Sequence, residues 1–170
     1  MSPEKTKELY DKYPLIFRQK DLDMRQTCMC WGFECADGWF DIIDGLCSDI
    51  QSHIDNQNYS INFKKERGTL PPDSPEFPQI EAVQVKEKFG GLRFYVNYED
   101  DYVRGLISMA ETMSYKICED CGNPGKPNDS GWICTLCNSC RSEQEARRKI
   151  LEEEAKNRLT VKMKDVTVAP

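Results

Sequence analysis

Four cysteines near the C-terminus constrain this sequence more than any other feature. Cys118 and Cys121 form one Cys-x-x-Cys pair, and Cys137 and Cys140 form a second pair after fifteen intervening residues. This spacing is typical of a four-thiolate zinc site, because a tight backbone turn lets two cysteines three apart bind the same ion. The sequence therefore predicts one structural zinc ion, whose closed ligand shell leaves no position for a substrate.

A fifth cysteine, Cys134, offers another way to form the second pair, because Cys134 and Cys137 are also three residues apart. We prefer Cys137 and Cys140, since residues 132–136 read as a short strand that leads into the second pair. Cys134 is then a spare thiol. The second pair precedes a predicted helix, as in zinc ribbons and treble clefs, where the helix dipole stabilises the thiolates.

A second group of possible ligands lies in the first third of the chain and contains Cys28, Cys30, Cys35 and Cys47, with His53 six residues further on. A second metal site is conceivable. The Cys-x-Cys spacing suits a zinc knuckle poorly, however, and Cys47 falls on the apolar face of a predicted helix, where cysteine behaves as a small hydrophobe. We interpret these residues as loop thiols and a core cysteine, and His53 as a surface residue near a helix C-terminus.

Length and composition indicate an ordinary folded domain in a reducing compartment. The 170 residues are enough to bury a hydrophobic core. No run approaches the roughly 18 apolar residues of a membrane span, and the N-terminus lacks the apolar region of a secretion signal. Nine cysteines in such a chain favour metal binding over disulfides. We therefore expect a cytoplasmic protein.

The first half of the chain contains helix signals and then strand signals. Ser2 followed by Pro3 predicts a helix start, and Tyr13-Pro14 should end that helix. A stronger amphipathic helix is expected from Asp37 or Gly38 to about Ile54. Residues 59–64 alternate like a strand, and the four prolines of residues 68–78 predict a loop.

The second half is expected to complete an α+β fold with helices packed on a small antiparallel sheet. Residues 80–88 and 92–98 read as a hairpin with its turn around Gly90-Gly91. A helix over residues 100–115 should bury its apolar positions, which are Val103, Leu106, Ile107, Ala110 and Met113. A solvated helix over residues 141–159 and a tail from Val161 follow. The predicted units are an α+β core (1–116), a zinc-binding module (117–141) and a charged helix with a tail (142–170).

The charge distribution indicates an acidic first third. Residues 1–58 hold eleven acids against six bases. Four of these acids form a predicted solvent-facing stripe, and we consider them candidate partner-binding residues: Asp37, Asp41, Asp44 and Asp55. Metal binding or acid–base chemistry by Asp41 and Asp44 is a weaker interpretation, because no basic or histidine partner lies nearby in the sequence.

Signals for enzymatic or nucleic-acid chemistry are weaker. A single histidine leaves few nucleophile–base pairs, and Gly90-Gly91 lacks the context of a phosphate-binding loop. Alternation places Arg93, Tyr95 and Asn97 on one strand face, which could stack single-stranded bases but is more typical of a half-buried strand. Basic residues after the zinc pairs could also contact nucleic acid: Arg141, Arg147, Arg148 and Lys149.

Four segments in a fixed order, residues 32–47, 85–96, 114–126 and 131–140, resemble an uncharacterised family of small proteins encoded by tailed phages and prophages. The resemblance covers roughly residues 30 to 140. Position 134 of that family is often not cysteine, which supports Cys118, Cys121, Cys137 and Cys140 as the ligands, while Cys28 and Cys30 fall outside its pattern. The resemblance implies a phage origin and a small accessory protein acting in the cytoplasm of a bacterial host.

The leading functional hypothesis is a non-enzymatic zinc-binding protein that uses its acidic helix to engage a host or phage protein. Its sharper form is inhibition of a host or defence enzyme that handles nucleic acid. The alternative hypothesis is a nucleic-acid-binding protein acting through the zinc module, and such binding should weaken steeply with salt.

Overall fold

The computed structural model describes residues 1–129 and 131–166, with side chains through residue 156. This part of the chain has four α-helices, which are α1 (Pro3–Lys12), α2 (Phe40–Glu66), α3 (Asp101–Ser114) and α4 (Asn138–Val166). The strands β1 (Phe33–Glu34), β2 (Ala82–Lys88) and β3 (Gly91–Val96) form one sheet, and β4 (Lys126–Pro127) pairs with β5 (Thr135–Leu136). Short 3₁₀ turns span Arg18–Asp21, Met29–Trp31 and Asp37–Trp39. The α+β class predicted from the sequence is confirmed.

Helix α1 begins and ends where its sequence signals predict. The Ser2 side chain accepts a hydrogen bond from the Lys5 backbone N–H, and Pro3 occupies the first helical position. The helix stops before Tyr13-Pro14, since proline cannot donate to the preceding turn.

Helix α2 is longer than predicted and corrects the expected strand at residues 59–64. Its 27 residues run without interruption through that segment. An existing helix extends by one hydrogen bond per added residue, whereas a strand needs a partner edge. Tyr59 and Phe63 also gain a contact available only in a helix, because their rings stack with centroids 6.4 Å apart at i,i+4.

The three-stranded sheet is mixed, so the expected all-antiparallel sheet is wrong for one pair of strands. β1 runs parallel to β2, with Phe33 opposite Val85, while β2 and β3 form the predicted antiparallel hairpin. The turn lies one residue earlier than predicted. Lys88 pairs with Gly91, which leaves Phe89 and Gly90 as the turn residues, both with positive φ.

Helix α3 packs against α2 and β3 through a narrower face than predicted. Val103 and Ala110 are buried, and Leu106 and Ile107 are partly buried against the core. Met113, which was expected to be buried, is 45% exposed. At the C-terminal end of the helix the buried side chains are instead the small ones of Ala110 and Ser114.

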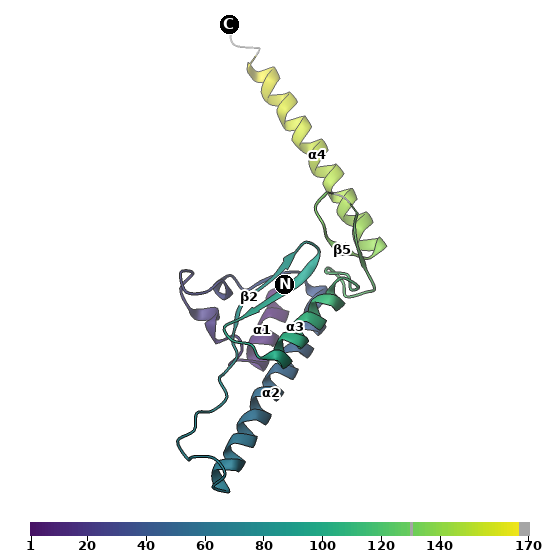
Figure 1. Cartoon of the computed structure of the whole chain (residues 1–170). Helices are drawn as coiled ribbons and strands as arrows, with labels where there is room; N and C mark the ends of the chain where they lie inside the picture. The colour runs from purple at the N-terminus through teal and green to yellow at the C-terminus, as the bar shows by residue number, and fades with distance from the viewer. Residues whose placement is uncertain (130, 167–170) are drawn as a thin grey trace.

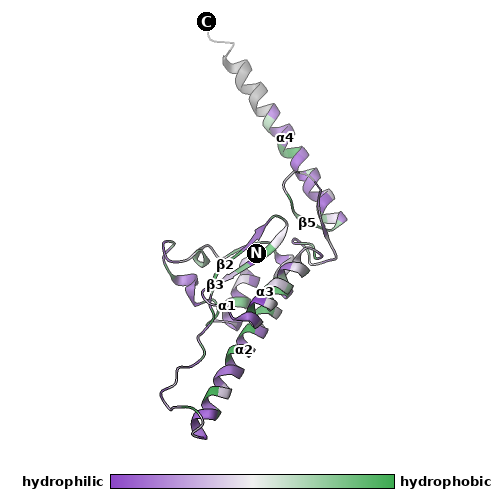
Figure 2. Ribbon diagram, viewed as in Figure 1, coloured by the Kyte–Doolittle hydropathy of each residue, from purple (hydrophilic) through white to green (hydrophobic). Residues whose placement is uncertain are grey.

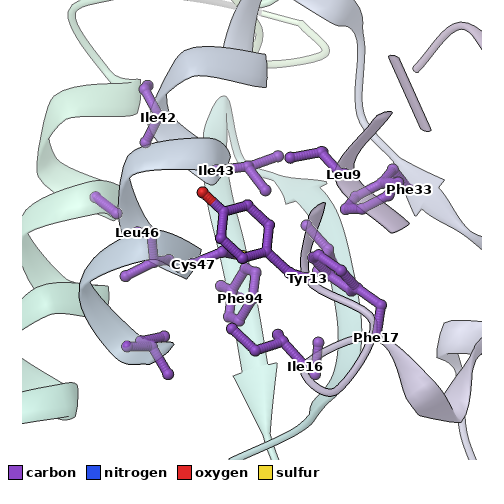
Figure 3. Packing of buried hydrophobic residues seen from close by; sticks show 14 of the residues in the cluster. Leu9, Tyr13, Ile16, Phe17, Phe33, Ile42, Ile43, Leu46, Cys47 and Phe94 are labelled. Atoms are coloured by element: carbon purple, nitrogen blue, oxygen red, sulfur yellow. The ribbon is translucent and has the colours of Figure 1, made fainter. Parts of the chain in front are cut away.

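One hydrophobic core joins α1, α2, α3 and the sheet (Figure 3). Phe17 is fully buried in it, and its ring meets Phe33 edge-on at 5.1 Å and Phe94 at 6.3 Å. Trp39, at the start of α2, is fully buried. Elements from both halves of the sequence thus share the same interior.

Helix α4 leaves this body and extends away from it (Figure 1). Its described surface is mostly hydrophilic (Figure 2). It continues to Val166, although a tail was expected from Val161, because nothing in this stretch of sequence breaks the helix. The rest of the predicted tail, residues 167–170, lies outside the described residues. Among the described helices, none is both long enough and apolar enough to cross a bilayer.

Candidate metal centre

The four cysteines predicted as zinc ligands converge at one point. The sulfur atoms of Cys118, Cys121, Cys137 and Cys140 all lie within 4.8 Å of one another, and those of Cys121 and Cys137 are 3.6 Å apart. Tetrahedral zinc with Zn–S bonds near 2.3 Å requires sulfur atoms about 3.8 Å apart. The four side chains can therefore hold one ion, and zinc suits four soft thiolates.

The first pair sits on a tight turn after α3. The Cys118 N–H donates to the carbonyl of Asn123 at 2.7 Å, and the Gly122 N–H donates to the carbonyl of Cys118 at 2.9 Å. Gly122 has φ of +77°, a conformation that glycine adopts without a steric penalty. These bonds close the loop so that both sulfur atoms point to the same place.

The second pair lies at the start of α4. Strand β5 leads into Cys137, and Cys140 occupies the first turn of the helix, where its N–H approaches the Cys137 sulfur at 3.4 Å. Free N–H groups and the helix dipole at this end stabilise negative thiolates. A knuckle, a two-stranded hairpin and a ligand-bearing helix are the elements of a treble clef, one of the two arrangements expected from the sequence.

Three of the four cysteines have shifted pKa values, and the directions of the shifts differ. A hydrogen bond from the Asn123 backbone N–H lowers the pKa of Cys121 to about 7. Burial raises the pKa of Cys118, and hydrogen bonds shared with Cys121 and Cys137 raise the pKa of Cys140. Since a metal binds thiolates, loading the site must release protons, and acid must weaken metal binding.

The first cysteine turn is docked on the start of α2. The Trp39 indole N–H donates to the carbonyl of Ile117 at 3.0 Å, and the Gly38 N–H donates to the carbonyl of Glu119 at 2.6 Å. A Cβ on Gly38 would lie 2.1 Å from the carbonyl oxygen of Cys118. Only glycine at position 38 therefore leaves room for the first cysteine turn to lie this close to the start of α2.

The β2–β3 hairpin makes the second contact with the metal module. The Thr135 hydroxyl, which is buried, donates to the carbonyl of Gly90 at 2.6 Å. A Cβ on Gly90 would lie 3.0 Å from Cγ2 of Ile133 in the module, and one on Gly91 would lie 2.4 Å from the ring of Tyr115 at the end of α3.

The sequence indicates only a helix start at Gly38 and a turn at Gly90-Gly91. The close contacts of these glycines are with segments far away in the chain. The only local signal for them is Trp39, which follows Gly38.

Cys134 lies outside the group of four, in keeping with its interpretation as a spare thiol. It is half-buried, its sulfur is 3.9 Å from Oε1 of Gln144, and burial raises its pKa. The strand expected over residues 132–136 is shorter and contains only Thr135 and Leu136.

The N-terminal cysteines do not assemble into a second site. Cys35 and Cys47 are buried and Cys28 is exposed. In the described part of the chain, the C-terminal four are the only group of three or more metal-binding side chains close enough to share an ion. Cys47 is a core residue, and burial raises its pKa well above the usual value.

His53 is not the surface residue expected near a helix C-terminus, because α2 continues for another three turns. Its side chain is 12% exposed, and Nε2 lies 2.7 Å from Oδ2 of Asp100. The ring stacks on Tyr102 with centroids 4.6 Å apart. His53 thus links α2 to the start of α3.

The four acids of the predicted stripe are not equivalent. Asp37 accepts a hydrogen bond from the Ser2 N–H at 2.6 Å, and Asp44 pairs with Lys12 at 2.7 Å. Asp41 and Asp55 are exposed. The structure therefore leaves two of the four carboxylates facing solvent, with the other two bound to α1 and its cap.

No protein-family model matches this chain. No curated protein and no solved structure matches it either. Of the resemblance drawn from the sequence, the structure supports the four-cysteine cluster, while the phage origin stays a prediction.

Proposed function

We propose that this chain is a non-enzymatic binding protein that contacts a protein partner through the exposed side of α2. This surface, which we name the α2 outer face, comprises Asp41, Ser48, Ser52, Asp55, Tyr59 and Phe63, all exposed. At about 100° per residue these positions all lie within about 40° of the direction of Asp41 around the helix axis, and together they span about 80°. The observation that carries the proposal is the continuation of α2 through residues 59–64, which aligns an aromatic pair with two exposed acids, Asp41 and Asp55.

The aromatic end of the α2 outer face has the chemistry of a binding hot spot. Tyr59 is 73% exposed and Phe63 is 42% exposed. The Arg67 guanidinium lies over the Phe63 ring at 4.3 Å, so arginine joins the pair. Tyrosine and arginine are enriched among residues that dominate interface energies. Stacking already orders these side chains, which lowers the entropy lost on binding.

The acidic end of the α2 outer face favours a basic partner. Asp41 and Asp55 would steer association with a positively charged surface, and the small Ser48 and Ser52 between them allow close approach. Enzymes that handle nucleic acid have such surfaces, because they bind phosphates. Together with the resemblance to phage proteins, this supports a host or defence enzyme as the partner in the sharper form of the proposal.

The proposal is tested by identifying a partner with the tagged, zinc-loaded chain and then measuring binding between the two purified proteins. The double change Tyr59→Ala and Phe63→Ala should weaken affinity at least about 100-fold, since two hot-spot side chains are lost. Asp41→Lys with Asp55→Lys should slow association and reduce its dependence on salt.

The matched controls are Trp31→Ala, which removes another exposed aromatic side chain, and Glu8→Lys, which reverses an exposed charge on α1. Both should leave affinity unchanged. A partner whose affinity responds equally to the controls and to the changes on α2 would exclude the α2 outer face as the binding surface.

A further inference from the structure

A groove of about 650 Å³ lies between the loop that precedes β5 and the first turns of α4, on the metal module and away from the α2 outer face. Its walls include Trp132, Arg141, Gln144, Arg147, Arg148 and Leu151. The groove combines one large aromatic side chain with several cations.

The charge of the groove is opposite to that of the whole chain. Arg141, Arg147 and Arg148 line it together with one acid, Glu145, and Arg148 also pairs with Glu152 at 3.6 Å, so the cations are in excess although the net charge of the protein is −6. Arg141 is held in place, because Nη2 donates to the carbonyl of Lys126 at 2.8 Å. A guanidinium fixed in this way keeps N–H donors for a phosphate.

Trp132 is the most exposed large hydrophobic side chain in the described part of the molecule, at 82% exposure. Its loop is nevertheless closed by Asn128, whose amide nitrogen donates to the carbonyl of Trp132 at 3.0 Å and whose amide oxygen accepts from the Cys134 N–H at 2.7 Å. The side chain of Asn128, at the start of the loop, thus holds the backbone of Trp132 and Cys134 on the opposite side of the loop. This arrangement presents an aromatic surface to solvent at a defined place beside the arginines.

We infer that this groove binds single-stranded nucleic acid, with a base stacked on Trp132 and phosphates on Arg141, Arg147 and Arg148. Aromatic side chains next to cations are the common means of binding single strands, because every base has a face to stack. A duplex hides those faces. The interaction is separate from the protein contact proposed for α2, and either one can fail without the other.

The test is fluorescence anisotropy of labelled single strands of about 12 nucleotides, one DNA and one RNA, and of a duplex of the same length, titrated with the zinc-loaded full chain. Single strands should bind, and Trp132→Ala should weaken that binding at least about tenfold. Arg147→Glu with Arg148→Glu should also weaken it at least about tenfold. If three arginines contact phosphates, the slope of log affinity against log salt should be about −2.

Trp31→Ala is the matched control, since Trp31 is 65% exposed but lies on the body of the protein. It should leave affinity unchanged. Quenching of tryptophan fluorescence by the single strand gives a second readout, and it should disappear in Trp132→Phe and persist in Trp31→Phe.

Three results would overturn the inference. They are no binding of either single strand at about 50 mM salt, equal effects of Trp132→Ala and Trp31→Ala, and binding of the duplex as tight as that of the single strands. The zinc content of each variant, measured in parallel, ensures that a loss of binding is not a loss of the metal module.

Discussion

At the scale of single residues, Gly38 does more for the metal centre than its place at a helix start suggests. A Cβ at this position would lie 2.1 Å from the carbonyl oxygen of Cys118 and 2.4 Å from the nitrogen of Gly122. Both atoms belong to the backbone of the first cysteine turn, so they cannot move aside as a flexible side chain would. Any larger residue must therefore push the turn away from the body.

Gly38→Ala should destabilise the protein by about 1–3 kcal/mol or more, the usual cost of inserting a methyl group where no space exists. Urea unfolding followed by circular dichroism in excess zinc measures the change. Gly45→Ala is the control, because its Cβ would meet nothing within 4 Å and the residue lies inside α2. That change should stabilise the helix by about 0.5–1 kcal/mol. Two variants of equal stability would show that the close approach at Gly38 does not exist in solution.

At the scale of elements, the sequence predicted those whose signals are local. Helix α1 has the cap residue Ser2 and Pro3 at its start and Pro14 just after its end. The β2–β3 hairpin has alternating polarity on both sides of a turn. Residues 59–64 also alternate, but the period of 2 spans only six residues, and the helix before them simply continues. Strand β1 has two residues, too few for any period, and its pairing with β2 depends on contacts about fifty positions away.

The contact between α2 and α3 could not be predicted from the sequence either. It depends on one carboxylate, that of Asp100. One oxygen of Asp100 accepts the Val103 N–H at 2.9 Å and caps α3, while the other lies 2.7 Å from His53. Partial burial acts to raise the pKa of Asp100, but the hydrogen bonds from Val103 and His53 keep this pKa below its usual value. The stabilisation is therefore present above about pH 4, the ordinary aspartate value, and is lost as the pH falls through the lowered folded value.

Asp100→Ala should reduce the free energy of unfolding at pH 7 by about 1–2 kcal/mol, because the cap and the contact with His53 disappear together. Urea unfolding at constant zinc measures the loss. Asp101→Ala removes a neighbouring acid that is 97% exposed and pairs with Arg104, so its effect should stay within about 0.5 kcal/mol. Equal losses in the two variants would contradict the role given to Asp100.

At the scale of the whole molecule, the metal module is built from a local pattern and a long-range fit. The ligand set could be predicted, because two Cys-x-x-Cys pairs encode their own geometry within 23 residues. The surface of the body on which the cysteine turn and the hairpin of the module pack could not be predicted. Trp39 and Gly38 contact the first cysteine turn, and Gly90 contacts Thr135, so residues about 45 to 80 positions away complete the site.

If the four cysteines hold a zinc ion, these contacts couple the binding of the ion to the packing of the module on the body. If the four thiolates are not drawn together, the turn that receives the Trp39 N–H loses its shape, and α4 loses its anchor. Metal binding to such a site contributes directly to folding free energy.

The most direct test is the zinc content of the full chain purified without chelator, measured together with its unfolding by urea. One zinc per chain is expected, lost together with much of the stability in Cys118→Ser, and retained in Cys134→Ser, which changes the thiol outside the cluster. Protein that contains no zinc, or a Cys118→Ser variant that keeps both its zinc and its stability, would contradict the presence of a structural zinc at this site.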